Sequence, residues 1–220
     1  MTQSLVSPAL RQRVRGLATP VALAFGRIGL TPNALTIIGF VGTCVAAGAA
    51  ATGSWTIAGV LIIAFGIFDL FDGTLARATG RASKFGAFLD STFDRTGENL
   101  VLAGVAVGCA LAGFPLGTLL AALAMAFASV VTYTRAKAES LGLHGEVGFA
   151  PREVRLVLLS IGLLVFGASG GFNRAAARTD WPVQILTISL GLIALLSAIT
   201  ILQRIIHVRR QLETQQQENQ

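Results

Sequence analysis

Hydrophobic residues in this chain gather into long runs that are separated by short polar segments. A transmembrane α-helix needs about 20 predominantly apolar residues, and six runs are of this size. They cover residues 33–52, 56–76, 88–112, 115–139, 153–171 and 183–203. The pattern predicts an all-α integral membrane protein with six transmembrane helices.

The two ends of the chain depart from this pattern. Residues 1–27 mix arginines with apolar residues and lack one clean apolar core, which predicts an interfacial amphipathic helix rather than a cleavable signal peptide. Residues 211–220 are polar and rich in Gln, which predicts a disordered tail. Residues 28–210 are then one six-helix membrane domain, since the sequence shows no internal repeat.

The composition agrees with a membrane protein. Hydrophobic residues make up 53% of the 220 residues and charged residues only 13%, with a mean hydropathy of +0.70. Soluble proteins carry about 25% charged residues, so an ordinary soluble domain is excluded. Cys44 and Cys109 lie in separate apolar runs, which favours packing roles over a disulfide or a zinc site.

Basic residues are distributed unevenly between the loops. The chain has 17 Lys and Arg residues and a net charge of +6. All but two, Arg174 and Arg178, fall at the termini or around the loops after the second and fourth runs. The positive-inside rule then predicts a cell-membrane protein with both termini in the cytoplasm and basic residues near anionic membrane lipids. This distribution argues against nucleic acid as a partner.

Four aspartates interrupt the second and third apolar runs. Each charge near the centre of a membrane helix costs about 2.5 to 3.5 kcal/mol, so these carboxylates require compensation. Asp69 and Asp72 are three residues apart and Asp90 and Asp94 four apart, which places each pair on one helix face. Two such helices packed together would bring four carboxylates to one place. Such a cluster suits two Mg²⁺ ions, with Mn²⁺ as the alternative.

Residues next to the aspartates favour a phosphate ligand. Gly73 follows Asp72, and Arg77 lies four residues further on the same side of the helix, where its guanidinium can hold a phosphate. The constellation therefore predicts metal-assisted phosphoryl chemistry. Two other classes stay open from the residues alone: a cation transporter that uses the carboxylates as ion ligands, and a structural membrane scaffold.

The pattern Asp69-x2-Asp72-Gly73-x2-Ala76-Arg77-x8-Gly86-x3-Asp90-x3-Asp94 resembles the complete signature of the CDP-alcohol phosphatidyltransferases. The resemblance extends from the LTPNALT segment at 30–36 to the end of the sixth run. It implies a transferase that cleaves a CDP-linked lipid, releases CMP and joins the phosphatidyl group to an alcohol. It also implies a homodimer with a cytoplasmic active site.

The resemblance also assigns site residues. Asp69, Asp72 and Asp90 would bind metal, while Asp94 would bind metal and act as the catalytic base. The residues that would contact the CDP moiety are Asn33, Ala34, Leu35, Thr36, Gly73, Arg77 and Ser83.

A second group of residues concerns the acceptor alcohol. Five basic residues lie at the cytoplasmic ends of the last three predicted spans, and a phosphate-bearing acceptor would need such a cluster. Pro151 suits a first helical turn, where free N–H groups also favour an anion. Ordinary positive-inside flanking charges are the alternative interpretation. The predicted acceptor residues are Arg135, Lys137, Arg152, Arg155 and Arg204.

Within the family, these segments most resemble the phosphatidylinositol phosphate synthases of actinobacteria. That resemblance implies CDP-diacylglycerol and myo-inositol phosphate as substrates. The sequence departs from the pattern at Pro151 and Val154, where the family has acidic residues, and in the order of Arg135 and Lys137. Phosphatidylglycerophosphate synthase, which uses glycerol 3-phosphate, is the nearest alternative.

Overall fold

The structure is a computed structural model that describes residues 8–174 and 180–218. Within these ranges the chain contains helices and no β-strand, which confirms the predicted all-α class. The helices are α1 (Pro8–Arg27), α2 (Pro32–Ala51), α3 (Trp55–Gly66), α4 (Phe68–Ala78), α5 (Lys84–Leu111), α6 (Pro115–Ser140), α7 (Arg152–Ala168), α8 (Gly171–Arg174) and α9 (Trp181–Glu218). Arg178 and the first seven residues of the predicted interfacial segment lie outside the described residues.

Local signals set the starts of the helices that carry the motif residues. The Thr31 hydroxyl caps α2 by accepting a hydrogen bond from the Ala34 N–H, and Pro32 occupies the first turn. The Ser83 hydroxyl caps α5 in the same way through the Gly86 N–H. Because of this cap, α5 begins at Lys84, four residues before the predicted span.

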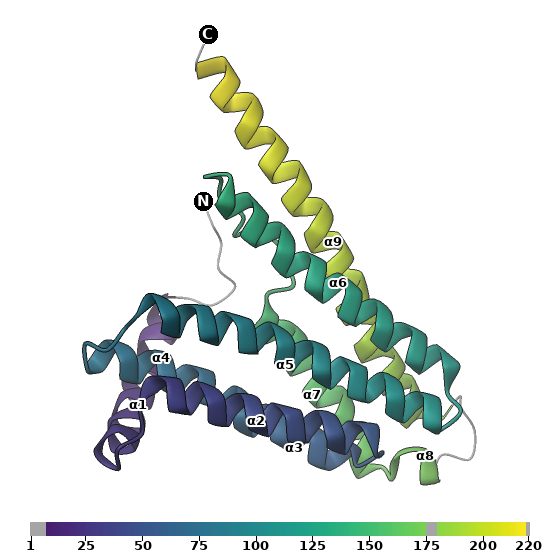
Figure 1. The fold of residues 1–220 in the computed structure, drawn as a ribbon. Helices are drawn as coiled ribbons and strands as arrows, with labels where there is room; N and C mark the ends of the chain where they lie inside the picture. The colour runs from purple at the N-terminus through teal and green to yellow at the C-terminus, as the bar shows by residue number, and fades with distance from the viewer. Residues whose placement is uncertain (1–7, 175–179, 219–220) are drawn as a thin grey trace.

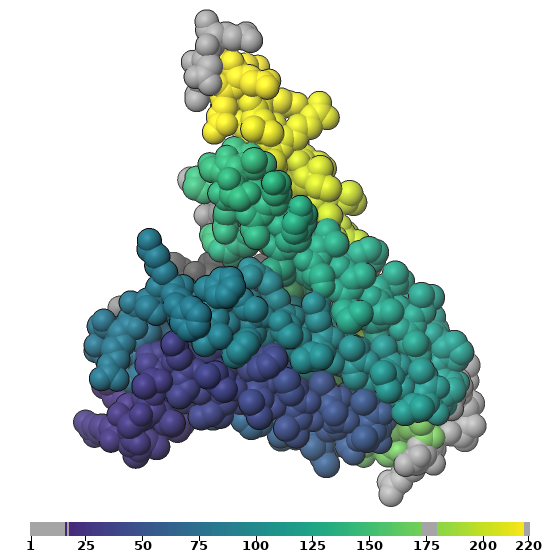
Figure 2. Space-filling model, viewed as in Figure 1, coloured from purple at the N-terminus to yellow at the C-terminus, as the bar shows by residue number. Residues whose placement is uncertain are grey.

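The helices pack in two groups that cross each other. In Figure 1, α2, α3 and α5 run side by side, and α6 pairs with α9 across them. α7 packs against α3 and α9, and α1 packs against α4. Figure 2 shows the ends of α6 and α9 projecting from the body of the molecule. The core between the groups includes Val101, Leu102, Val105, Leu159, Leu163, Phe166, Leu186 and Leu190.

Small residues allow α2 and α5 to approach closely. A Cβ atom at Gly104 would collide with the carbonyl oxygen of Ala47, and one at Gly108 with that of Ala50. The glycines of α5 therefore make an intrachain contact with α2, as is common between membrane helices.

Four helical segments in the described residues are long and apolar enough to cross a membrane. They are α2, α3 together with α4, α6 and α9. Of the other predicted spans, α5 carries charged residues through its first half and α7 has only 17 residues. Together with the exposed apolar side chains on these helices, the four segments identify a membrane protein.

The second predicted span is divided into two helices. α3 ends at Gly66 and α4 begins at Phe68, while Ile67 keeps helical angles of φ −71° and ψ −25°. The Leu70 N–H donates to the Ile67 carbonyl at 3.0 Å, a tighter turn than an α-helix makes. A break next to glycine is a common place for a helix to bend, and it lets α4 lean toward α1.

The predicted disordered tail is wrong for most of its length. α9 continues as a helix through Glu218, and only residues 219–220 lie outside the described residues. The tail contains no Gly or Pro to end the helix, and Gln, Glu and Leu are good helix formers. Gln211 also exchanges two hydrogen bonds with the backbone of His144 in the α6–α7 loop. That contact holds Gln211, the first residue of the predicted tail, against the α6–α7 loop.

Candidate metal and phosphate site

Three of the four motif aspartates converge where α4 meets α5. Asp69 and Asp72 come from α4 and Asp90 from α5, and each offers a carboxylate oxygen within 4.8 Å of the other two. Asp72 is only 4% exposed, while the other two are partly buried. Hard oxygen donors at this separation fit a divalent cation such as Mg²⁺ or Mn²⁺. We call Asp69, Asp72 and Asp90 the acidic cluster.

Asp72 is held in place from two sides. The Thr36 hydroxyl of α2 donates to Asp72 Oδ2 at 2.6 Å, and the Gly73 N–H donates to Asp72 Oδ1. Two predicted nucleotide residues, Thr36 and Gly73, thus lie against the acidic cluster. Arg77 folds back over Gly73, with Nη1 3.4 Å from the position that a Cβ of residue 73 would take.

The first turns of α2 and α5 lie next to each other. A Cβ atom at Gly86 would stand 3.0 Å from Asn33 Oδ1 and 3.1 Å from Ser83 Oγ. Glycine at this position therefore lets the two predicted nucleotide residues come together. Helix N-termini present free N–H groups that favour phosphate, so this junction suits a pyrophosphate beside the acidic cluster.

The remaining two nucleotide candidates are used for packing and capping. The Leu35 side chain is fully buried with Ala22 and Leu75. The Ala34 N–H is already bonded to the Thr31 hydroxyl. Direct contact of their side chains with a nucleotide stays a prediction.

Arg152, at the start of α7, bridges the carboxylates of α4 and α5. Its Nη1 contacts Asp69 Oδ2 and lies 2.7 Å from Asp94 Oδ2. Asp94 thus pairs with an arginine, and its oxygens are not among those of the acidic cluster. Its roles as metal ligand and base stay predictions, while the predicted acceptor residue Arg152 lies beside the aspartates.

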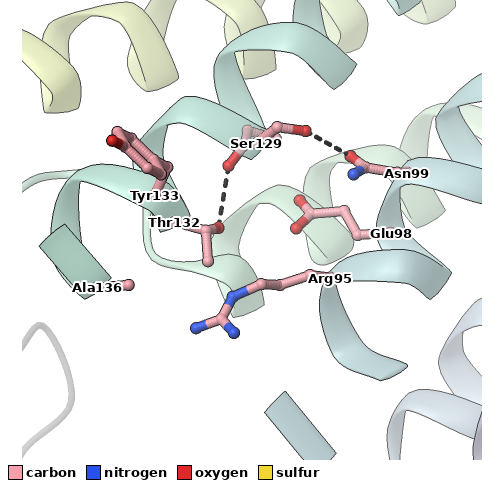
Figure 3. Close-up of a pocket in the computed structure, with 8 residues that line it drawn as sticks. Arg95, Glu98, Asn99, Ser129, Thr132, Tyr133 and Ala136 are labelled. Carbon is pink, nitrogen blue, oxygen red and sulfur yellow. Dashed lines mark hydrogen bonds between the residues drawn. The ribbon is translucent and has the colours of Figure 1, made fainter. Parts of the chain in front are cut away.

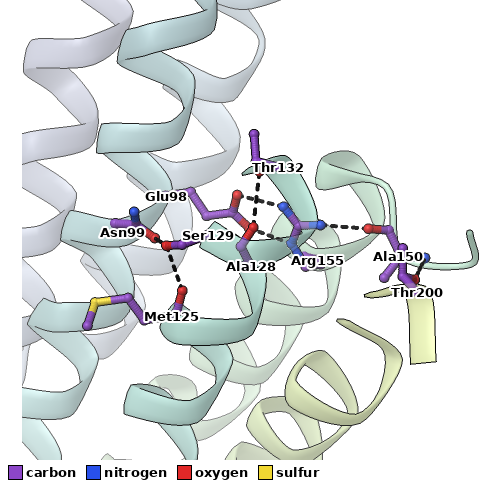
Figure 4. Close-up of polar contacts among 9 residues, drawn as sticks. All are labelled: Glu98, Asn99, Met125, Ala128, Ser129, Thr132, Ala150, Arg155 and Thr200. Atoms are coloured by element: carbon purple, nitrogen blue, oxygen red, sulfur yellow. Dashed lines mark hydrogen bonds and ion pairs between the residues drawn. The ribbon is translucent and has the colours of Figure 1, made fainter. Parts of the chain in front are cut away.

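Arg155 lies one turn further along α7 and forms a buried ion pair with Glu98. Arg155 Nε is 2.6 Å from Glu98 Oε1 and Nη2 is 2.7 Å from Oε2, while Nη1 donates to the Ala150 carbonyl at 2.6 Å (Figure 4). The Ala150 N–H in turn donates to the Thr200 hydroxyl of α9 at 3.1 Å. Sequence reasoning missed Glu98, although it follows Asp90 and Asp94 at four-residue spacing on α5.

Arg204 ties α9 to the α6–α7 loop. It is largely buried and donates from Nε to the Val147 carbonyl at 2.9 Å and from Nη1 to the Val131 carbonyl. Arg135 and Arg155 both lie within electrostatic range of Arg204. Three predicted acceptor residues therefore gather near one another, around the loop that joins α6 to α7.

The two basic residues of α6, Arg135 and Lys137, lie at its exposed end. Arg135 Nε pairs with Glu139 at 2.8 Å, and Nη2 pairs with Glu146. Lys137 is exposed, and its ammonium group makes no hydrogen bond or ion pair within the described ranges. Of the five predicted acceptor residues, Lys137 is thus the one whose charged group no described residue engages.

A cavity of about 260 Å³ lies between α5 and α6 (Figure 3). Across it the Ser129 hydroxyl donates to Asn99 Oδ1 at 3.0 Å. Glu98 both lines this cavity and pairs with Arg155, so the cavity lies next to that predicted acceptor residue. Its lining residues are Arg95, Glu98, Asn99, Ala128, Ser129, Thr132, Tyr133 and Ala136.

Comparison with known proteins identifies the relatives of this chain. The family model for CDP-alcohol phosphatidyltransferase matches residues 29–208. The phosphatidylinositol phosphate synthase of Cutibacterium acnes is 38% identical over 197 residues, which cover 89% of this chain and 93% of that protein.

Two crystal structures of the Mycobacterium tuberculosis phosphatidylinositol phosphate synthase share the fold at 31% identity. The structure with CDP-DAG bound has a TM-score of 0.75 and covers 87% of this chain and 92% of that one. The complex with manganese and citrate has a TM-score of 0.76 and covers 87% and 88%. Because the family model spans most of the sequence, this chain belongs to the CDP-alcohol phosphatidyltransferase family.

Proposed function

We propose that this protein is an Mg²⁺-dependent transferase that moves the phosphatidyl group from CDP-diacylglycerol to myo-inositol phosphate. The products are CMP and phosphatidylinositol phosphate. The convergence of Asp69, Asp72 and Asp90 beside the first turns of α2 and α5 carries the proposal. The relatives named phosphatidylinositol phosphate synthase support the choice of substrates, and membership of an enzyme family argues against the cation transporter and the scaffold.

The metal residues are Asp69, Asp72 and Asp90, with Asp94 completing a site for two ions. Bound Mg²⁺ supplies Lewis-acid polarisation of the pyrophosphate and neutralises charge on the leaving CMP, and Mn²⁺ is the alternative ion. Thr36 keeps Asp72 oriented through its 2.6 Å hydrogen bond. The complex of the related synthase with manganese supports a divalent ion at these residues.

The nucleotide binds where α2, α4 and α5 meet. Backbone and polar groups at the first turns of α2 and α5 hold its phosphates, and Arg77 steadies one of them. Gly73 and Gly86 leave room for close approach to the backbone. The residues proposed for this site are Asn33, Ala34, Leu35, Thr36, Gly73, Arg77 and Ser83.

The reaction is a direct displacement on the phosphorus attached to diacylglycerol. An acceptor hydroxyl oxygen bonds to that phosphorus, the bond to the CMP oxygen breaks, and Asp94 accepts the hydroxyl proton. Arg152 lies 2.7 Å from Asp94, so an acceptor phosphate bound by Arg152 would bring its hydroxyl close to the base. Proximity of this kind is a major source of rate enhancement.

The acceptor phosphate is bound by basic residues at the ends of α6, α7 and α9. The grouping of Arg135, Arg155 and Arg204 around the α6–α7 loop supports one shared site. Lys137 and Arg152 would extend it toward the solvent and toward the acidic cluster. Free serine, choline or unphosphorylated inositol would not need such a concentration of charge.

The protein crosses the cell membrane six times, with α5 and α7 added to the four long apolar segments. At 1.5 Å per residue, α7 is about 25 Å long, close to the roughly 30 Å hydrocarbon core. α1, within residues 1–27, lies at the membrane interface beside α4. The basic loops place the termini and the active site in the cytoplasm, near anionic lipids. Residues 28–210 are the transferase domain, and the chain acts as a homodimer.

CMP release from the purified protein tests the proposal. We expect release with CDP-diacylglycerol, Mg²⁺ and inositol phosphate, and none after thorough chelation of the metal. Glycerol 3-phosphate in place of inositol phosphate is the matched control, because it also carries both a phosphate and a hydroxyl that can attack. Release with glycerol 3-phosphate alone would contradict the inositol assignment, and full activity in chelator would contradict the metal mechanism.

A further inference from the structure

Glu98 is a buried acidic residue that the eight-position motif does not include. Its side chain is 5% exposed, and the side chain of its partner Arg155 is 3% exposed. Both carboxylate oxygens contact the guanidinium, at 2.6 and 2.7 Å (Figure 4). Two fully desolvated charges are thus joined in a bidentate pair inside a membrane protein.

A buried ion pair of this kind is weak evidence for stability alone. Desolvation of both charges offsets much of their attraction, and apolar replacements of the same volume are often as stable. What the bidentate geometry does provide is orientation, because the planar guanidinium is fixed by a matching carboxylate. The pair therefore points to a role in placing Arg155.

The bonds of Arg155 leave part of its guanidinium available. Nε and Nη2 donate to Glu98, and Nη1 donates to the Ala150 carbonyl. A guanidinium has five N–H groups, so Nη1 and Nη2 each keep one more. Both remaining N–H groups lie in the guanidinium plane, and each can donate to an anion.

α5 and α7, which the Glu98–Arg155 pair joins, are also joined one turn away by the ion pair between Asp94 and Arg152. Asp94 and Glu98 are four residues apart on α5, and Arg152 and Arg155 are three apart on α7. α7 packs mainly against α3 and α9, so these long side chains span the space between α5 and α7. Glu98 thus links the helix that carries Asp90 and Asp94 to the arginine proposed for the acceptor.

We propose that Glu98 is a positioning residue that holds Arg155 in the orientation needed to bind the phosphate of the acceptor. This inference rests on the proposed function, in which Arg155 belongs to the acceptor site. Glu98 does not touch the substrate; it acts by fixing the guanidinium plane and by leaving two N–H groups for the phosphate.

The test compares steady-state kinetics of full-length purified variants. Glu98→Gln keeps the size of the side chain but offers only one oxygen, so the bidentate contact is lost. We expect it to raise KM for inositol phosphate about tenfold to a hundredfold, with KM for CDP-diacylglycerol unchanged. Glu98→Asp keeps the carboxylate, so it should give a smaller rise. Glu213→Gln removes the acidic partner of the exposed Arg209 and should leave both KM values unchanged.

A double variant separates positioning from general structure. If Glu98 acts through Arg155, then Glu98→Gln adds little to the acceptor KM of Arg155→Lys, since the two changes disrupt one contact. Additive losses, or equal losses toward both substrates, would overturn the proposal. If Glu98→Gln does not fold, the same cycle is run with Glu98→Asp. Wild-type protein without CMP release would refute the proposed function, whereas an active wild type with an unchanged acceptor KM in Glu98→Gln overturns only the positioning role.

Discussion

Arg152 Nη1 lies 2.7 Å from Asp94 Oδ2 and also contacts Asp69, so one guanidinium bridges carboxylates of α4 and α5. All three side chains are about one-quarter exposed. Solvent therefore reaches the place where α7 brings its positive charge to the aspartates. Asp69 belongs to the acidic cluster. The guanidinium of Arg152 therefore neutralises carboxylate charge that a bound divalent ion would otherwise neutralise.

Arg152→Ala should make the protein more dependent on metal for its stability. Without the guanidinium, Asp69 and Asp94 repel each other, and a bound cation relieves that repulsion. We expect the rise in Tm caused by saturating Mn²⁺ to be larger in the variant than in the wild type, by about 2–4 °C for each kcal/mol involved. Thermal unfolding with and without Mn²⁺ provides the measurement.

Arg209→Ala is the matched control for this experiment. Arg209 also pairs with a carboxylate, that of Glu213, but on the exposed part of α9. Its Mn²⁺-induced shift should equal that of the wild type. If Mn²⁺ raises the Tm of Arg152→Ala by no more than that of the wild type, the guanidinium of Arg152 does not lie at the metal position.

Asp90→Asn and Asp94→Asn should fail in different ways. Asp90 belongs to the acidic cluster, so its amide should weaken Mn²⁺ binding and lower kcat/KM by about a hundredfold or more. Asp94→Asn removes the proposed base, and the three carboxylates of the acidic cluster stay in place. It should abolish turnover while CDP-diacylglycerol and one Mn²⁺ ion still bind, although Asp94 no longer completes a site for two ions. Electron paramagnetic resonance of Mn²⁺ and a binding assay with the CDP-lipid distinguish the two. Retention of turnover in Asp94→Asn would exclude Asp94 as the base.

The acidic cluster and the main helices could be predicted because each depends on local sequence. Apolar length predicts a membrane helix, and all six predicted runs fall on helical segments. The three- and four-residue spacing of the aspartates predicts one face on each helix, which allowed the cluster to be anticipated. Helix ends were less accurate, since caps such as Ser83 extend a helix beyond its apolar run.

The partners of the buried arginines could not be predicted in the same way. Arg155 meets Glu98 across 57 positions of sequence, and Arg204 meets Val131 across 73. Such contacts depend on how α5, α6, α7 and α9 pack, which hydrophobic periodicity does not specify. The break after Gly66 was also missed, because the apolar run continues through it without interruption.

Arg204→Met should loosen the α6–α7 loop. The change keeps an apolar stem but removes the donors to the carbonyls of Val147 and Val131. The Val131 carbonyl keeps the hydrogen bond from the Thr134 hydroxyl, but the Val147 carbonyl loses its donor. An unpaired carbonyl costs about 1–3 kcal/mol, so the Tm should fall and hydrogen exchange in residues 141–151 should accelerate. Arg210→Met, at an exposed position of α9, is the control. Unchanged exchange in the loop would contradict a clamping role for Arg204.

Thr36→Val should weaken metal binding without disturbing the fold. Valine has nearly the shape of threonine but cannot donate the 2.6 Å hydrogen bond to Asp72 Oδ2. Loss of a partner that orients a metal ligand commonly costs about tenfold to a hundredfold in metal affinity. Thr43→Val is a matched control two turns along α2, because the Thr43 hydroxyl donates only to the Gly39 carbonyl of its own helix. Titration with Mn²⁺ should separate the two variants, and equal affinities would show that Thr36 does not orient Asp72 for the ion.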